Sequence, residues 1–270
     1  QTLSAMARFL STASRFGAQR TGTLYVVAAP MGNLMDVSFR AAETLLRVPV
    51  VAAEAIHVAE TLIRTLRRRS MAGGELWAAV EEGEPPDGQR LVSYHGHNEE
   101  ERVPELIDVL RNGSDVALVC RAGTPIFRDP GRLLVTAAHA REIRVSPLPG
   151  PCSVIAALSA SGLPGDRLLF EGYLPVLRAE RVRRLKHLRT LNFGNAGGRA
   201  TLAFLGDGAS VSEVLHDIQD VMGARVTACV AKELTAPYER VMVGPAKELW
   251  NRWHSFPDEV RRGAVVILVE

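Results

Sequence analysis

The stretch A-G-T-P-I-F-R-D-P-G at residues 122–131 decides the fold class, together with P-L-P-G-P-C-S at residues 147–153. Each stretch follows a short apolar run. Its prolines and glycines exclude a helix interior and a central strand, because proline lacks the amide donor and glycine relaxes the backbone. Both are therefore predicted to be loops that leave the ends of sheet strands, where α/β proteins keep their binding groups. This arrangement predicts a cleft for a small molecule.

Working outward, apolar runs alternate with helical patterns along most of the chain. The nearly all-apolar run at residues 23–29 is typical of a strand buried on both faces of a parallel sheet. Asp36 or Ser38 can cap the helix that follows. Further strands are expected at residues 50–53, 91–94, 116–120, 143–148, 168–173, 201–205, 225–231 and 265–269. Helices are expected at residues 58–69, 99–111, 133–140, 153–161, 179–188, 210–222 and 246–254.

This alternation predicts an α/β protein with two domains, at residues 22–149 and 150–270, preceded by an arm at residues 1–21. Residues 71–89, rich in Gly, Pro and acid, are expected to form a surface loop. The arm carries Arg8, Arg15 and Arg20, and no acidic residue precedes Asp36. That composition is typical of organelle transit segments and predicts a mitochondrial matrix location, with a plain disordered arm as the alternative.

Composition narrows the class of protein. No apolar run approaches the roughly 20 residues needed to cross a bilayer, so no membrane partner is expected. The net charge of +2, from 32 basic against 30 acidic residues, does not by itself argue for a polyanionic partner. Cys120, Cys152 and Cys229 are odd in number and widely spaced, which excludes a disulfide framework and a structural zinc cluster. We expect them to be small buried residues.

Several strings resemble the tetrapyrrole-methylase superfamily, and within it the small-subunit ribosomal RNA (cytidine ribose 2′-O) methyltransferases of the RsmI type. They are G-T-L-Y-V-V-A-A-P-M-G-N-L (22–34), V-S-Y-H-G-H-N-E-E-E-R (92–102), V-A-L-V-C-R-A-G-T-P (116–125), D-P-G (129–131), P-L-P-G-P (147–151), A-L-S-A-S-G-L-P (157–164), F-E-G-Y-L-P (170–175) and A-K-E-L-T (231–235). The resemblance implies two α/β/α domains with S-adenosylmethionine bound in the cleft between them, commonly in a homodimer. It also implies small-subunit ribosomal RNA and ribosome assembly particles as partners.

On this resemblance, the cofactor pocket would be lined by Pro30, Gly32, Asn33, Ala122, Gly123, Thr124, Pro149, Gly150 and Ser153. These residue types suit the cofactor. Glycines let the backbone approach adenine and ribose, and a sulfonium cofactor has no phosphate that would demand a helix N-terminus or a lysine.

The chain departs from the family pattern at three places. A-E-A-I-H at residues 53–57 replaces the usual C-E-D-T-R and keeps only Glu54. Arg121 stands where the family has an acid, which leaves open whether it blocks the cofactor pocket, and Ile126 stands where the family has a glycine. The usual tyrosine-glutamate and proline-histidine-arginine string is absent at residues 205–211.

Methyl transfer to a ribose hydroxyl needs alignment of acceptor, methyl and sulfur, and removal of a proton. Glu54 and Asp129 are the candidate catalytic groups, against the alternatives of a solvated helix-start carboxylate and a turn cap. His95 and His97 lack further ligands at suitable spacing, so no metal site is predicted. A partial dinucleotide fingerprint at residues 206–208 lacks its third glycine, and a plain strand-to-helix turn is the favoured interpretation.

The candidate RNA-binding surface is a basic helix, in which Glu180 is the single acid. Such a helix can neutralise phosphates without reading sequence, and a solvated surface helix is the alternative. The candidate residues are Arg178, Arg181, Arg183, Arg184, Lys186 and Arg189. Arg64, Arg67, Arg68 and Arg69 form a second basic run, which would extend the same surface.

Three hypotheses follow. The first is an S-adenosylmethionine-dependent ribose 2′-O-methyltransferase that acts on small-subunit ribosomal RNA. The second is an inactive member of the same fold that serves as a mitochondrial small-subunit assembly factor, motivated by the altered strings. The third is a small-molecule tetrapyrrole methylase, which the longer ribosomal-type strings disfavour.

Overall fold

The computed structural model describes residues 21–71, 88–193 and 199–270. The predicted arm lies outside these residues except for Thr21, and so does most of the predicted loop at residues 71–89. The described chain forms two compact units. One consists of the chain up to Ala28 with Ser38–Pro149, and the other of Ala29–Val37 with Gly150–Glu270. A border falls between Pro149 and Gly150, and the short segment Ala29–Val37 groups with the second unit.

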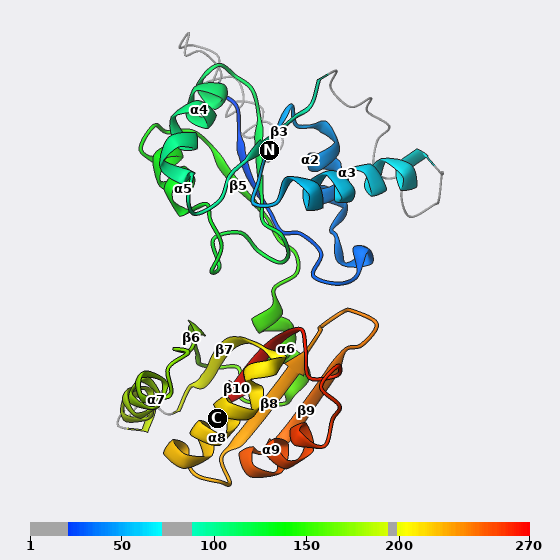
Figure 1. The fold of residues 1–270 in the computed structure, drawn as a ribbon. Coiled ribbons are helices and arrows are strands. Elements are labelled where there is room, and N and C mark those ends of the chain that lie inside the picture. Colours follow the sequence, from blue (N-terminus) through cyan, green and yellow to red (C-terminus); the bar gives the residue numbers. More distant parts are fainter. Residues whose placement is uncertain (1–20, 72–87, 194–198) are drawn as a thin grey trace, which may run out of the picture. The chain divides into compact units, whose positions relative to one another are not determined.

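The first unit is built on a five-stranded parallel sheet of order β3-β2-β4-β1-β5 (Figure 1). Its strands are β1 (Leu24–Val27), β2 (Val50–Ala53), β3 (Arg90–Ser93), β4 (Val116–Val119) and β5 (Val145–Leu148). Its helices are α2 (Phe39–Arg47), α3 (Ile56–Met71), α4 (Glu99–Arg111) and α5 (Arg132–His139). Strands β2 and β4 are buried at every position, as expected for central parallel strands covered on both faces.

The helices of the first unit are held against the sheet by apolar side chains. Leu106 and Leu110 of α4 and Leu134 of α5 join a core with Val92 and Leu118 of the sheet. Helix α2 packs with α3 on the other side of the strands (Figure 1). The N-cap of α2 is Ser38, whose hydroxyl accepts a hydrogen bond from the amide of Ala41, so of the two predicted caps the serine is used.

The second unit is built on a mixed sheet of order β6-β7-β10-β8-β9, in which only β6 and β7 are parallel. Its strands are β6 (Leu168–Tyr173), β7 (Thr201–Asp207), β8 (Thr227–Lys232), β9 (Arg240–Pro245) and β10 (Ala264–Val269). Its helices are α6 (Ser153–Ser161), α7 (Arg178–Phe193), α8 (Val211–Met222) and α9 (Ala246–His254), with short 3-10 turns η1 (Leu34–Asp36) and η2 (Gly208–Ser210).

Alternate residues of the strands face opposite sides of the sheet, so the second unit has three layers: α6, the sheet, and the helices α7, α8 and α9. Leu202 and Phe204 of β7 face the helices α7, α8 and α9, whereas Ala203 faces α6. The side chain of Trp253 is fully buried in the larger of these two cores. Over the described part of the chain, no helix has the length and apolar content needed to cross a membrane.

Candidate functional site

The carboxyl edge of the parallel sheet gathers the polar groups of the first unit. Because the strands are parallel, their carboxyl ends lie at one edge, where ligands of open α/β sheets usually bind. Glu54 follows β2, Cys120 and the loop at residues 121–131 follow β4, and Pro149 follows β5. The predicted residues Ala122, Gly123 and Thr124 lie in that loop, with Gly123 buried and Ala122 exposed.

The loop after β4 has an unusual backbone. Gly123 and Gly131 adopt positive φ, as glycine allows, but Ile126 (φ 74°) and Arg128 (φ 71°) do so as well. Positive φ is a genuine outlier for a β-branched residue and costs energy. Ile126 therefore keeps the backbone shape that a glycine would adopt at this position. Residues held in this way are most often found at functional sites.

The two predicted catalytic carboxylates interact with each other. The Oε2 atom of Glu54 accepts a hydrogen bond from the backbone amide of Arg121 at 2.9 Å. Asp129 is half-buried, and burial followed by the charge of Glu54 raises its pKa to about 6. Burial, and then the charge of Asp129, raise the pKa of the neighbouring Cys120 thiol. The edge thus holds two carboxylates, and the pKa of one of them, Asp129, lies well above its ordinary value.

Sequence reasoning missed a residue that fixes this corner. Glu99, at the start of α4, accepts a hydrogen bond from the amide of Gly131 through Oε1 at 2.5 Å. That contact ties the D-P-G turn to α4. The available signal was an acid in the first turn of a helix, which the string at residues 92–102 contains three times.

His95 and His97 lie in the loop between β3 and α4. Asn98 accepts a hydrogen bond from the His95 amide through Oδ1 and donates one to the Ser93 carbonyl through Nδ2. The two imidazole centroids are 6.0 Å apart. These contacts order the chain between β3 and α4.

The remaining predicted cofactor residues belong to the second unit. Asn33 caps η1, since its Oδ1 accepts a hydrogen bond from the Met35 amide at 3.0 Å. Gly32 lies so close to Ala236 that an added Cβ would be 2.9 Å from that residue's backbone nitrogen. Gly150 is exposed, and Ser153 is the first residue of α6.

Two buried oxygens flank the Gly32 loop without a hydrogen-bond partner in the described chain. They are Oδ2 of Asp36 and Oγ1 of Thr235, and Thr235 adopts a positive φ of 66°. Buried polar atoms normally bond to protein or to ordered water, so each of these oxygens is available to a water or to a polar ligand. Sequence reasoning missed both residues, although Thr235 ends one of the quoted strings.

The structure divides the predicted RNA-binding residues into two groups. Arg181 is only 3% exposed and bonds Asp217, Glu213 and the carbonyls of residues 175 and 176. It is therefore a structural residue of the interior and not part of an RNA-binding surface. The others are exposed, although Arg178 pairs with Asp217 and Asp220, Arg184 with Glu171, and Arg189 donates to the carbonyl of Val221.

Two further clusters have structural explanations. His216, Asp217 and Asp220 offer potential metal ligands within 4.8 Å of one another, but Arg178 and Arg181 already bond both carboxylate oxygens of Asp217. In the partial dinucleotide fingerprint, a Cβ on Gly208 would lie 2.1 Å from the carbonyl oxygen of Arg261. That glycine is thus required by close backbone packing.

Comparisons with known proteins agree with this architecture. The sequence model of the family described as Tetrapyrrole (Corrin/Porphyrin) Methylases matches residues 23–249. Ribosomal RNA small subunit methyltransferase I of Pseudomonas aeruginosa is 40% identical over 252 residues, which cover 92% of this chain and 78% of that protein. The protein of the same description from Escherichia coli O157:H7 is 35% identical over 249 residues, covering 92% and 78%.

Solved structures show the same fold at low sequence identity. A diphthine synthase has a TM-score of 0.60 at 15% identity, covering 92% of this chain and 90% of its own. Uroporphyrin-III C-methyl transferase from Thermus thermophilus, complexed with S-adenyl homocysteine, has a TM-score of 0.53 at 20% identity, covering 92% and 98%.

Proposed function

The chain belongs to the tetrapyrrole (corrin/porphyrin) methylases and, within them, groups with the ribosomal RNA small subunit methyltransferases I, and from this membership we propose its reaction. It transfers a methyl group from S-adenosylmethionine to a ribose 2′-hydroxyl of small-subunit ribosomal RNA. The observation that carries the proposal is the match to ribosomal RNA methyltransferases at 31–40% identity over more than nine-tenths of the chain.

The residues present fit the cofactor. An adenosyl ligand offers hydroxyls, ring nitrogens and an amino-acid group, and the unpartnered oxygens of Asp36 and Thr235 are suitable acceptors or donors for them. Gly32 lets its loop pack directly against the backbone of Ala236, next to Thr235, and a side chain at this position would collide with that turn. As the cofactor-binding residues we propose those that the family resemblance implies, namely Pro30, Gly32, Asn33, Ala122, Gly123, Thr124, Pro149, Gly150 and Ser153.

The cofactor supplies an electrophilic methyl group on its sulfonium sulfur. The chain must then accept the hydroxyl proton, and we assign this task to Asp129. Its pKa of about 6 leaves it ionised but still basic near neutral pH, which suits a general base. Glu54 is a positioning residue, because it holds the amide of Arg121 and raises the pKa of Asp129.

The test is methyl transfer with radiolabelled S-adenosylmethionine, using small-subunit RNA and small-subunit particles as separate acceptors, after calorimetry has measured cofactor binding. We expect cofactor uptake and a labelled ribose in RNA. The rate should rise with pH through about 6, and Asp129→Asn should lower kcat by about 10²- to 10⁴-fold while cofactor affinity is retained.

One alternative has observations in its favour. The altered string at residues 53–57 and the base at Arg121 favour an inactive protein that acts in small-subunit assembly. Arg121 is exposed and forms no ion pair with any residue of the described ranges. Binding to particles without cofactor uptake would establish the assembly factor. Reaction with a tetrapyrrole and none with RNA would instead establish a small-molecule methylase.

Location and assembly state are part of the proposal. The basic, acid-free composition before Asp36 supports a mitochondrial matrix location, which a fluorescent fusion and import into isolated mitochondria would test. Family membership supports a homodimer in isolation, and light scattering on the purified protein would measure it.

A further inference from the structure

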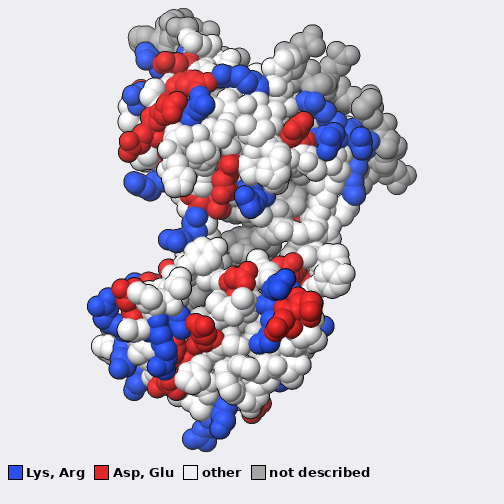
Figure 2. Space-filling model, in the orientation of Figure 1, with Lys and Arg blue, Asp and Glu red and all other residues white. Residues whose placement is uncertain are grey.

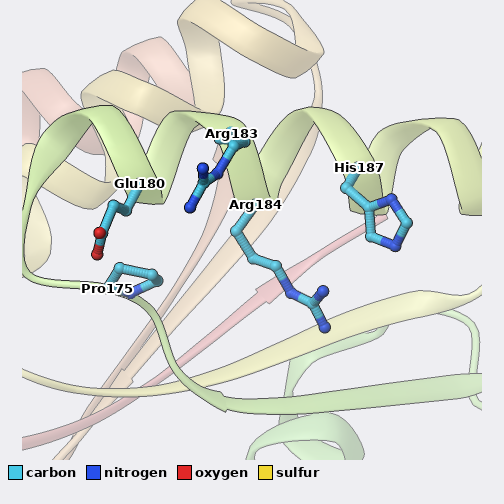
Figure 3. A pocket seen from close by; sticks show the side chains of 5 residues that line it. All are labelled: Pro175, Glu180, Arg183, Arg184 and His187. Atoms are coloured by element: carbon cyan, nitrogen blue, oxygen red, sulfur yellow. The ribbon is translucent and has the colours of Figure 1, made fainter.

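A groove of about 500 Å³ lies along α7 in the second unit. It is lined by Pro175, Glu180, Arg183, Arg184 and His187. Figure 3 shows the four side chains of the helix on the same side of α7, as their spacing of three, four and seven residues requires. The volume is within the range of pockets that hold small organic ligands, and it would accommodate a nucleotide unit.

The charges around the groove are not all balanced. Arg184 pairs with Glu171 of β6, and Arg178 pairs with acids of α8. Arg183 and Lys186 are exposed and form no ion pair within residues 21–71, 88–193 and 199–270. They are one helical turn apart, so their side chains are neighbours. Figure 2 shows both signs of charge mixed over the region where Figure 1 places α7.

Exposed apolar side chains and a hydrogen-bond acceptor also lie at the groove. Val176 and Leu177, next to Pro175, are 90% and 66% exposed. Glu180 offers a carboxylate that accepts hydrogen bonds from a ribose hydroxyl or a base amino group. The groove itself contributes the cation Arg183 and the acceptor Glu180, and Lys186 and the exposed apolar residues lie beside it. This combination matches a sugar-phosphate chain with bases better than a compact anion.

We propose that the α7 groove binds the backbone of a single-stranded RNA segment, with Arg183 in the groove and Lys186 beside it on α7 each neutralising a phosphate. The inference rests on the proposed function for the identity of that RNA as a ribosomal substrate. The groove belongs to the second unit, whereas Glu54 and Asp129 belong to the first. Phosphate contacts position an RNA without reading its sequence, so the groove supplies affinity and orientation.

The experiment measures the affinity of the whole protein for a fluorescently labelled single-stranded oligoribonucleotide between about 50 and 200 mM salt. Neutralising one phosphate of a single strand contributes a slope of about −0.7 to log K against log[salt]. Arg183→Gln and Lys186→Gln should each remove about 0.7 from the slope and weaken binding about fourfold at 0.15 M salt. Lys247→Gln, at an exposed lysine of α9, is the matched control and should change neither quantity.

A gain-of-affinity variant guards against effects of misfolding. Glu180→Gln removes the negative charge inside the groove and keeps a hydrogen-bond acceptor, so it should tighten RNA binding severalfold. A damaged fold would not produce this result.

The outcomes separate this proposal from the enzymatic one. Unchanged affinity and slope in Arg183→Gln and Lys186→Gln overturn the groove assignment, even if the wild-type protein methylates RNA. Weaker binding with an unchanged slope also overturns it, because phosphates are then not the ligand. A slope that depends on Arg183 in a protein without methyl transfer retains the groove and removes the enzyme. Binding of a ribosomal protein but not of RNA shows that the surface has a protein partner and overturns the proposal.

Discussion

Arg181 and Arg183 are two residues apart on α7, yet their environments differ completely. Arg181 is on the stripe of Leu185 and Leu188 and points into the interior, whereas Arg183 is exposed at the groove. Composition alone assigns both to a basic surface. Periodicity distinguishes them, because residues four and seven positions after Arg181 are the leucines of the apolar face. The same test applied to the sequence would have removed Arg181 from the RNA-binding set.

Replacement of Arg181 should destabilise the protein. Arg181→Met leaves the carboxylate of Asp217 buried with a weakened set of partners, and loss of one member of a buried ion pair typically costs about 3 kcal/mol or more. Denaturant unfolding should show this loss. Arg183→Met is the matched exposed control and should stay within about 0.5 kcal/mol of the wild type.

The double variant Arg181→Met with Asp217→Leu tests the cause. Removing both charges should recover part of the lost free energy of unfolding, because no unpaired buried charge remains. Equal stability of Arg181→Met and Arg183→Met would contradict the structural role of Arg181.

Asp129 should make stability depend on pH in the direction opposite to most carboxylates. Its folded-state pKa of about 6 exceeds its ordinary value of 3.8 because of burial and Glu54. The folded state therefore holds a proton between these pH values that the unfolded state has released. The free energy of unfolding falls as pH rises from about 4 to about 6, by about 1 kcal/mol after allowance for solvent screening of a half-buried group.

The pH dependence is checked by denaturant unfolding of the wild type and of Asp129→Asn at a series of pH values. The amide cannot ionise, so the variant should lack this fall and gain stability relative to the wild type above pH 6. A constant difference between the two proteins across this range would mean that Asp129 has an ordinary pKa.

At the level of elements, most helices and strands follow from apolar periodicity and caps. The predicted bounds of β2, α4, α6, β6 and α9 match the structure, since each has a clear apolar pattern and a start or stop signal. Strand β9 was missed. Its sequence R-V-M-V-G-P contains a short apolar run followed by Gly and Pro, and within the described residues it pairs with β8 alone, at the edge of the sheet. Only the antiparallel pairing with β8 identifies it as a strand.

The close contact between the Gly32 loop and the turn after β8 allows the cofactor assignment to be tested by substitution. A methyl group at Gly32 would meet the backbone nitrogen and Cβ of Ala236 at 2.9 Å. That nitrogen donates to the carbonyl of Glu233, so the turn yields poorly. Gly32→Ala should displace the loop and weaken binding of S-adenosylhomocysteine by about tenfold or more, corresponding to about 1.4 kcal/mol.

Calorimetry on Gly32→Ala gives the dissociation constant directly. Gly165→Ala is the control within the same unit, since its added Cβ would meet only a Leu158 methyl at 3.9 Å. If both variants bind the cofactor as the wild type does, the Gly32 loop does not line the pocket.

For the whole molecule, the sequence predicted two α/β units but not the strand orders. The order β3-β2-β4-β1-β5 and the antiparallel pairs of β10 are set by contacts between residues far apart in the chain, which local patterns do not encode. For the same reason, the grouping of Ala29–Val37 with the second unit could not be foreseen. It depends on contacts such as Gly32 with Ala236, about two hundred positions apart in the sequence.

The alkylation rates of the three cysteines should depend on the folding of both units and on cofactor binding. Burial raises the pKa of the Cys120 thiol in the first unit and that of Cys229 in the second, the latter to about 11. Because the thiolate is the reactive form, both should resist iodoacetamide in the native protein at about pH 8 and react only when their own unit unfolds. Cys152, half-exposed at the N-cap of α6, should be alkylated first.

Cys152 lies between the proposed cofactor residues Gly150 and Ser153, so ligand binding should shield it. Saturating S-adenosylhomocysteine should slow its alkylation, measured by mass spectrometry of peptides, and leave Cys120 and Cys229 slow throughout. Gly32→Ala should lose this protection at ligand concentrations that protect the wild type, because its affinity is lower. Protection that is absent while calorimetry detects binding would remove Gly150 and Ser153 from the pocket.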